Sequence, residues 1–263
     1  MRYGIRKGRL LVSVTLAVLA LGSCSAQAEL IERGDLFVRF KGGIDPTALP
    51  RTKRAPIAVE VAGTVKTLSG EHPPALRMVR IELNRGGVLD PRGLLDCHRS
   101  QLIAATPEEA MENCGPALVG NGAYRAKTAF PEQTAFPSQG QILAFNGVYE
   151  GGDAIFAHVY GIHPVPINNV IVFRVRRSGG RFGTILTGRL PESLNPHGYV
   201  AALYLKLFRR YVFHGQPRSY ISAACAAPSG FPSAVFPFAR TSMAFADGRT
   251  LSSTLTRSCR VKG

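Results

Sequence analysis

The sequence predicts an all-β fold, mainly an antiparallel β-sandwich of the Ig-like or jelly-roll-like kind, with one short helix near 107–114. Three observations favour this class. Short segments in which apolar and polar residues alternate recur along the chain, and this is the pattern of half-buried strands. Turn residues separate these segments at the spacing expected of an all-β sandwich. Only one segment carries a convincing set of signals for the start and the end of a helix.

Residues 1–28 have the features of an export signal. Positions 1–9 hold four basic residues and no acidic one, and the apolar run 10–21 is shorter than the ~20 residues that span a bilayer. Two cleavage signals follow, a lipoprotein-like site before Cys24 and the small-residue pattern Ala26-Gln27-Ala28. We expect cleavage after Ala28 and secretion. The alternative is a membrane-tethered lipoprotein held through Cys24.

Three parts are expected along the chain: the signal peptide over 1–28, an N-terminal extension or linker over 29–56, and a single disulfide-stapled sandwich domain over 57–263. Apolar residues make up 45% of the sequence, which is sufficient for a substantial core. No segment after the signal is both long and apolar enough to span a bilayer. We therefore expect no transmembrane segment in the mature chain.

The strands predicted in the first part of the chain are short and alternate at least partly in polarity. They cover 36–40, 57–61, 78–83, 141–145 and 154–160.

Later strands are expected to form hairpins. Strands over 170–175 and 182–187 flank Ser178-Gly179-Gly180, and strands over 234–245 and 250–256 flank Asp247-Gly248.

Residues 199–213 fit two interpretations. Their apolar positions match a helical stripe, but His214-Gly215-Gln216-Pro217 and the following β-like residues favour a strand–turn–strand. We expect strands here, because the surrounding sequence is β-like.

The one predicted helix begins at a recognisable cap. Thr106 is suited to the N-cap, Pro107 to the first helical position, and Glu109 stands where a capping box requires an acidic partner. Gly115 is expected to end the helix directly after Cys114.

Five cysteines are present, of which Cys24 is either removed or lipidated. An even number in an exported chain indicates two disulfides, and the four that remain allow three connectivities. We expect Cys97–Cys114 and Cys225–Cys259, because each of these pairs closes a local segment.

The chain is strongly basic, with a net charge of +15. Residues 174–218 contribute nine basic residues and one acidic residue, whereas 29–173 are close to neutral. Such asymmetry attracts polyanions. The candidate polyanion-binding residues are Arg174, Arg176, Arg177, Arg181, Arg209 and Arg210. The expected partners are anionic cell-wall polymers or lipid headgroups rather than nucleic acid, because no nucleic-acid-binding motif is present.

The sequence offers little sign of catalysis. It contains no Gly-x-Ser-x-Gly, no His-Glu-x-x-His and no phosphate-binding glycine loop, and we expect no cofactor. Asp153, His158 and His163 form the best cluster for acid–base or metal chemistry. However, residues five apart on one strand point to opposite faces, so a structural role is favoured for both histidines and no metal site is expected.

Four segments resemble an uncharacterised family of exported bacterial proteins of the high-GC Gram-positive type. The segments are CGPALVGNGAY (114–124), AHVYGIHPVP (157–166), FGTILTGRLP (182–191) and SGFPSAVFPFARTSMAFADGRTLSSTLTRSC (229–259). The resemblance implies export and a single recurring module, and it implies no activity, cofactor or catalytic residue.

Together these observations predict an exported, non-catalytic binding or structural module of the cell envelope or its surroundings. Contact with anionic envelope polymers is expected through the basic C-terminal half. The alternative is a secreted hydrolase or metal-dependent enzyme that uses the His158/His163 region.

Overall fold

The fold was established from a computed structural model that describes residues 28–128, 134–163, 166–191 and 198–262. A large sheet contains thirteen strands, and all its pairings are antiparallel except the one between β18 and β3. In spatial order the strands are β1 (Glu29–Arg33), β2 (Leu36–Asp45), β5 (Ala58–Thr67), β13 (Gly198–Leu207), β8 (Leu118–Thr128), β9 (Phe136–Tyr149), β10 (Gly152–Gly161), β11 (Ile167–Arg177), β12 (Phe182–Arg189), β6 (Leu76–Asn84), β17 (Ser233–Phe245), β18 (Thr250–Val261) and β3 (Ala48–Leu49).

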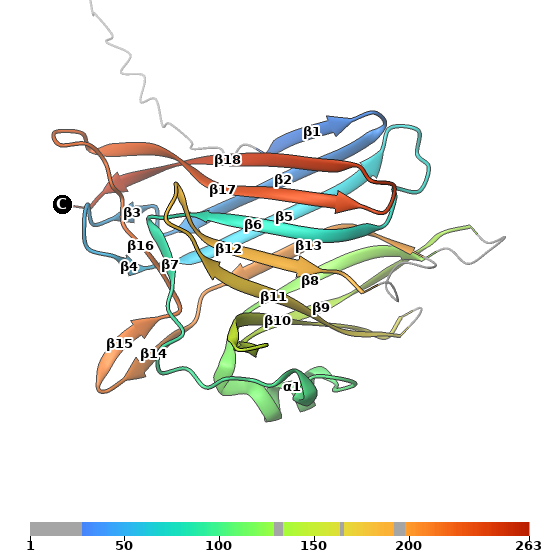
Figure 1. The fold of residues 1–263 in the computed structure, drawn as a ribbon, viewed down its shortest axis with the longest axis horizontal. Coiled ribbons are helices and arrows are strands. Elements are labelled where there is room, and N and C mark those ends of the chain that lie inside the picture. Colours follow the sequence, from blue (N-terminus) through green and yellow to red (C-terminus); the bar gives the residue numbers. More distant parts are fainter. Residues whose placement is uncertain (1–27, 129–133, 164–165, 192–197, 263) are drawn as a thin grey trace, which may run out of the picture.

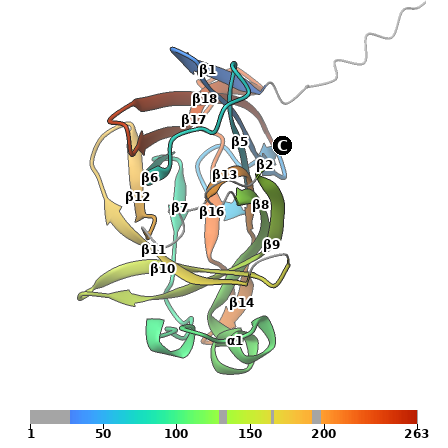
Figure 2. The ribbon, with the colours of Figure 1, turned by 90° about the vertical axis from the view of Figure 1, so that its right-hand side faces the viewer.

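The sheet curls until strands near its two ends come together, as Figure 2 shows when the molecule is viewed along the curl. Hydrogen bonds to a side chain of β1 connect this strand to β18. The carboxylate of Glu29 accepts hydrogen bonds from the Ser253 hydroxyl at 2.8 Å and from the Thr256 backbone N–H at 3.1 Å. The all-β, mainly antiparallel class is confirmed, and the two layers of the predicted sandwich are opposite parts of one hydrogen-bonded sheet.

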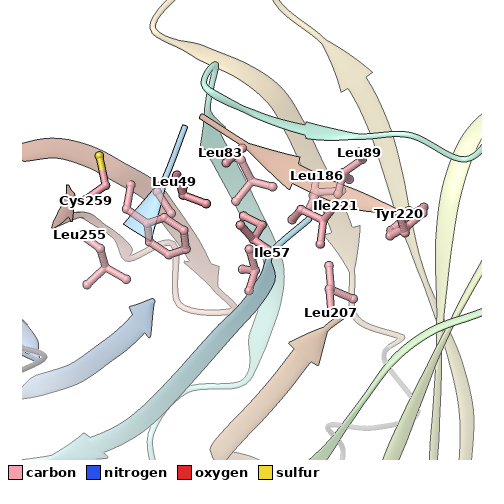
Figure 3. Packing of buried hydrophobic residues seen from close by; sticks show 14 of the residues in the cluster. Leu49, Ile57, Leu83, Leu89, Leu186, Leu207, Tyr220, Ile221, Leu255 and Cys259 are labelled. Atoms are coloured by element: carbon pink, nitrogen blue, oxygen red, sulfur yellow. The ribbon is translucent and has the colours of Figure 1, made fainter. Parts of the chain in front are cut away.

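A small sheet lies inside the curl, and it consists of β4 (Ala55–Pro56), β16 (Ile221–Ala223) and β7 (Gly87–Leu89). Its apolar residues complete the main core, where Leu89 and Ile221 of the inner sheet, together with Ile57 just after β4, meet Leu83 and Leu207 of the large sheet (Figure 3). Inward-pointing residues of the large sheet supply most of this core, because alternate positions along each strand face the interior. The inner sheet thus fills a space that the curled sheet alone would leave open.

The helical segment lies against the outside of the curl, below β9 and β10 in Figure 1. It comprises η1 (Arg99–Gln101), α1 (Pro107–Cys114) and η2 (Gly115–Ala117). The predicted capping box is confirmed: the Glu109 backbone N–H donates to the Thr106 hydroxyl at 3.3 Å, and the Thr106 N–H donates to the Glu109 carboxylate at 2.7 Å. The helix ends at Cys114 as expected, but Gly115 keeps a right-handed φ of −52° and begins a 3-10 turn.

Both predicted disulfides are present. Cys97–Cys114 holds the helical segment to the outer cluster, and Cys225–Cys259 lies in the main core, with Cα–Cα distances of 5.3 and 5.7 Å.

The strand interpretation of the ambiguous segment is also confirmed. It forms β13 and β14 (Arg210–Phe213), and β14 pairs with β15 (Gln216–Ser219) in a separate hairpin. The turn at Gly179-Gly180 joins β11 to β12, and the turn at Asp247-Gly248 joins β17 to β18.

Residues 29–56 differ from the sequence expectation. They were expected to form an extension or linker, but β2 pairs with β5 over its whole length and buries Leu36, Val38 and Phe40. Burial of these side chains makes the strand an integral part of the sheet. The predicted signal peptide, including Cys24, lies outside the described residues apart from Ala28. Within the described ranges, no helix has the length and apolar character needed to cross a membrane.

Candidate functional site: a basic outer face

Four neighbouring strands, β2, β5, β13 and β8, place their basic side chains on one outer face of the curled sheet. Strand alternation is the cause. Val38 and Phe40 point into the core, so Arg39, which lies between them, and Lys41, which follows Phe40, point outward. The same alternation applies to the other three strands. We call this surface the basic face, and its basic residues are Arg39, Lys41, Lys66, Arg125, Lys127 and Lys206.

The strand register places small residues between two basic flanks. Arg39 is opposite Thr64, Thr64 is opposite Ala202, and Ala202 is opposite Arg125. The next row runs from Lys41 across Ala62, Tyr204 and Ala123. Three strand spacings separate β2 from β8, so the two flanks are roughly 14 Å apart along the sheet.

The small side chains leave a hollow in this surface. Its volume is about 550 Å³, and its floor includes Ala62, Thr64, Ala123 and Ala202. Tyr204 lies beside the floor with 38% of its surface exposed. By contrast, the outer face of β9 and β10 is covered by the helical segment. The basic face thus combines a shallow, accessible floor with cationic borders.

Most of the charge on this face is uncompensated. Lys206 forms an ion pair with Glu60 at 2.7 Å, and this contact raises the pKa of the lysine. Within the described ranges, the other five basic side chains form no ion pair or hydrogen bond. Asp45, at the end of β2, is the only other acidic residue on the four strands. The face therefore has a net positive charge that an anionic ligand could neutralise.

The arginines predicted to bind polyanions do not form one cluster. Arg174 and Arg176 are exposed on the outer face of β11, and Arg174 forms an ion pair with Glu150 and lies 5.1 Å from the centre of the Tyr149 ring. Arg177 points to the opposite side of the strand, where it donates to the Thr184 hydroxyl at 3.1 Å.

The remaining predicted arginines lie in other parts of the fold. Arg181 is in the turn before β12, and Arg209 and Arg210 lie at the start of the β14–β15 hairpin, which projects away from the large sheet in Figure 1. The structure therefore distributes the predicted set over several surfaces. Its role in binding polyanions stays a prediction.

The two candidate histidines are also apart. His158 is fully buried beneath the helical segment, with its Nε2 atom 2.9 Å from the Ala105 carbonyl oxygen. His163 is exposed beyond the end of β10, and five residues of extended chain span roughly 16 Å. Burial lowers the pKa of His158, and contacts with the Ala105 carbonyl and the Asn168 side chain partly oppose this shift.

No group of three or more His, Cys, Asp and Glu side chains is arranged to hold a metal ion within the described part of the chain. The alternative of an enzyme that uses these histidines stays a prediction.

Sequence reasoning missed the basic face for an identifiable reason. The charge count over 29–173 balances basic residues of β2, β5 and β8 against acidic residues on other surfaces, including Glu108, Glu109 and Glu112 of α1. A count restricted to outward positions of predicted strands would have separated the two groups. It would still not have shown that these strands are neighbours.

Comparisons with protein-family models, curated proteins and solved structures find no match for this chain, so the expected membership of an exported bacterial family stays a prediction.

Proposed function

We propose that the protein is an exported, non-catalytic module that binds an anionic polymer of the cell envelope or its surroundings. The observation that carries this proposal is the basic face, where five basic side chains without partners share one outer surface with an accessible hollow that Arg125 lines. The two disulfides support an extracytoplasmic location, because such bonds persist mainly in oxidising compartments.

An extended polyanion suits this surface better than a compact anion. The basic side chains are distributed over four adjacent strands, so a compact anion can contact only some of them at once. A polymer with repeated negative charges can contact Arg39 and Lys41 on one flank and Arg125 and Lys127 on the other. Each exposed contact contributes only about 0.2–1 kcal/mol, so useful affinity requires several contacts together.

The test is retention of the purified mature protein on immobilised polyphosphate. The double variant Arg39→Gln/Lys41→Gln removes two charges from one flank, and we expect it to elute at clearly lower salt than the wild type. The matched control is Arg174→Gln/Arg176→Gln, which removes the same charge from a different outer surface. We expect the control to elute close to the wild type.

Salt dependence gives a second measurement. The screening length falls from about 10 Å at 0.1 M salt to about 3 Å at 1 M, so retention should disappear as salt increases. Equal elution of the two double variants would contradict the assignment to the basic face. Failure of the wild type to bind any polyanion at low salt would contradict the proposed function as a whole.

A further inference from the structure

A second feature with binding potential lies inside the curl, where the inner sheet meets β17 and β18. A partly open cavity of about 130 Å³ is lined there mainly by apolar side chains. Ile57, Leu83 and Ile221 contribute to its wall, together with Phe238 and Cys259. Figure 3 shows that Ile57, Leu83, Ile221 and Cys259 come from different segments of the chain that converge on this part of the core.

The wall of the cavity contains few polar side-chain groups that could bind water. Asn84 is the only residue with a polar side-chain group, other than the disulfide sulfur, in its wall. Both ends of this amide are already engaged: Nδ2 donates to the Pro237 carbonyl at 2.9 Å, and Oδ1 accepts from the Gly86 N–H at 2.8 Å. A buried water needs two to four polar partners, whereas an apolar cavity of ~150 Å³ can hold benzene. The size and lining of this cavity therefore suit a hydrocarbon group.

The apolar wall continues to the protein surface. Val235 lines the cavity, yet 75% of its surface is exposed, and the wall residue Ala226 is exposed as well. A hydrocarbon chain could therefore enter past these two residues while the rest of its molecule remains in solvent.

Basic residues border this apolar wall. Arg85 directly precedes the wall residue Gly86, and Arg260 directly follows the wall residue Cys259. Arg54 precedes Ala55, which pairs with the wall residue Ala223. All three arginines are exposed, and their side chains form no ion pair within the part of the chain that the structure describes. An anionic group at the surface end of a bound chain would thus be stabilised by charge complementarity.

We propose that this cavity binds the hydrocarbon chain of a single-chain anionic amphiphile of the fatty-acid type, with its carboxylate at the arginine-bordered opening. The site is separate from the basic face and does not depend on the proposed polymer binding.

The chain-length dependence of binding provides the first test. Calorimetric titration of the mature protein with butanoate, hexanoate and octanoate should show affinity that increases about fourfold per added methylene until the cavity is full. This factor corresponds to ~0.8 kcal/mol for each buried methylene. Octan-1-ol, which has the same chain without the charge, should bind at least threefold more weakly than octanoate.

Variants assign the binding to this cavity. Ala226→Leu should block the opening and reduce octanoate affinity at least tenfold, and Val235→Asp at an exposed position should have the same effect by placing a negative charge in the entry path. Arg85→Gln should weaken octanoate binding but leave octan-1-ol binding unchanged. Lys127→Gln removes the same charge from the basic face and serves as the matched control. Melting temperatures identify any variant that fails to fold.

Three results would overturn the inference. The first is absence of octanoate binding to the wild type at millimolar concentration. The second is unchanged octanoate affinity in folded Ala226→Leu and Val235→Asp. The third is equal affinity for octanoate and octan-1-ol, which would show that the carboxylate does not contribute to binding and that the ligand need not be anionic. Loss of polymer retention without loss of octanoate binding would affect only the proposed function.

Discussion

The burial of His158 predicts that the protein loses stability as the pH falls below neutrality. The imidazole is completely buried, and its Nε2 atom is 2.9 Å from the Ala105 carbonyl oxygen, so the neutral ring donates its proton there. Nδ1 is buried and has no hydrogen-bond partner among the described residues. A second proton on the ring would create a charge in this buried position, and its desolvation accounts for the lowered pKa of His158.

The sign and size of the effect follow from proton linkage. Above the ordinary histidine pKa of 6.5, the ring is neutral in both the folded and the unfolded chain, so it adds no pH dependence. Below 6.5 the unfolded chain takes up a proton that the folded protein does not. The free energy of unfolding should then fall by up to about 1.4 kcal/mol per pH unit until the folded-state pKa is reached. For a domain of this size, that loss corresponds to a decrease in Tm of roughly 3–6 °C per pH unit.

The assay is thermal unfolding at pH 7.5, 6.0 and 5.0, with His158→Gln as the comparison. Glutamine has no titratable group and can still donate to the Ala105 carbonyl. The variant should be less stable than the wild type at pH 7.5, because the ring packing is lost, but its stability should change less between pH 7.5 and pH 5.0. Parallel pH dependences of the wild type and the variant would refute the reasoning, since the slope would then come from other groups.

Two further predictions concern stability. Replacing Cys97 and Cys114 together by alanine should cost about 3 kcal/mol in the chain-entropy account of a 17-residue separation, measured by denaturant unfolding, and an unchanged midpoint would contradict a stabilising role. Glu82 is buried, and the adjacent Arg240 side chain lowers the pKa of its carboxyl group. Glu82→Gln should destabilise the fold by about 1–3 kcal/mol at pH 7, and the difference from wild type should shrink as the pH falls below 4.5, where the glutamate of the unfolded chain becomes protonated while that of the folded protein is still ionised.

The all-β class was predictable because strand formation depends strongly on local patterns. The alternation in 36–40 and 78–83 identifies two strands and also the side of each strand that is buried. Hairpins such as β11–β12 and β17–β18 were predictable for the same reason, since glycine-containing turns join adjacent strands directly. The capping box at Thr106 is equally local, because all its atoms lie within one helical turn.

The candidate site was only partly predictable. The sequence drew attention to basic charge, but it favoured the arginine-rich segment in which Arg177 and Arg209 lie in different parts of the fold. The basic face takes three of its strands from the first half of the chain and one, β13, from the second. A charge count along the chain cannot detect such a surface, because its residues come from strands that are far apart in the sequence, from β2 at Leu36–Asp45 to β13 at Gly198–Leu207.

The sequence by itself determined the local properties of this protein: the strand pattern, the single helix, the even cysteine count after the predicted export signal, and the basic excess. Tertiary structure decided which strands are neighbours. The insertion of β13 between β5 and β8 places Lys41 and Arg125 on the same face, and the inner sheet creates the apolar cavity near Val235. The physical reason is that side-chain direction follows from a two-residue period within one strand, whereas strand order depends on how the whole sheet buries its apolar side as it curls.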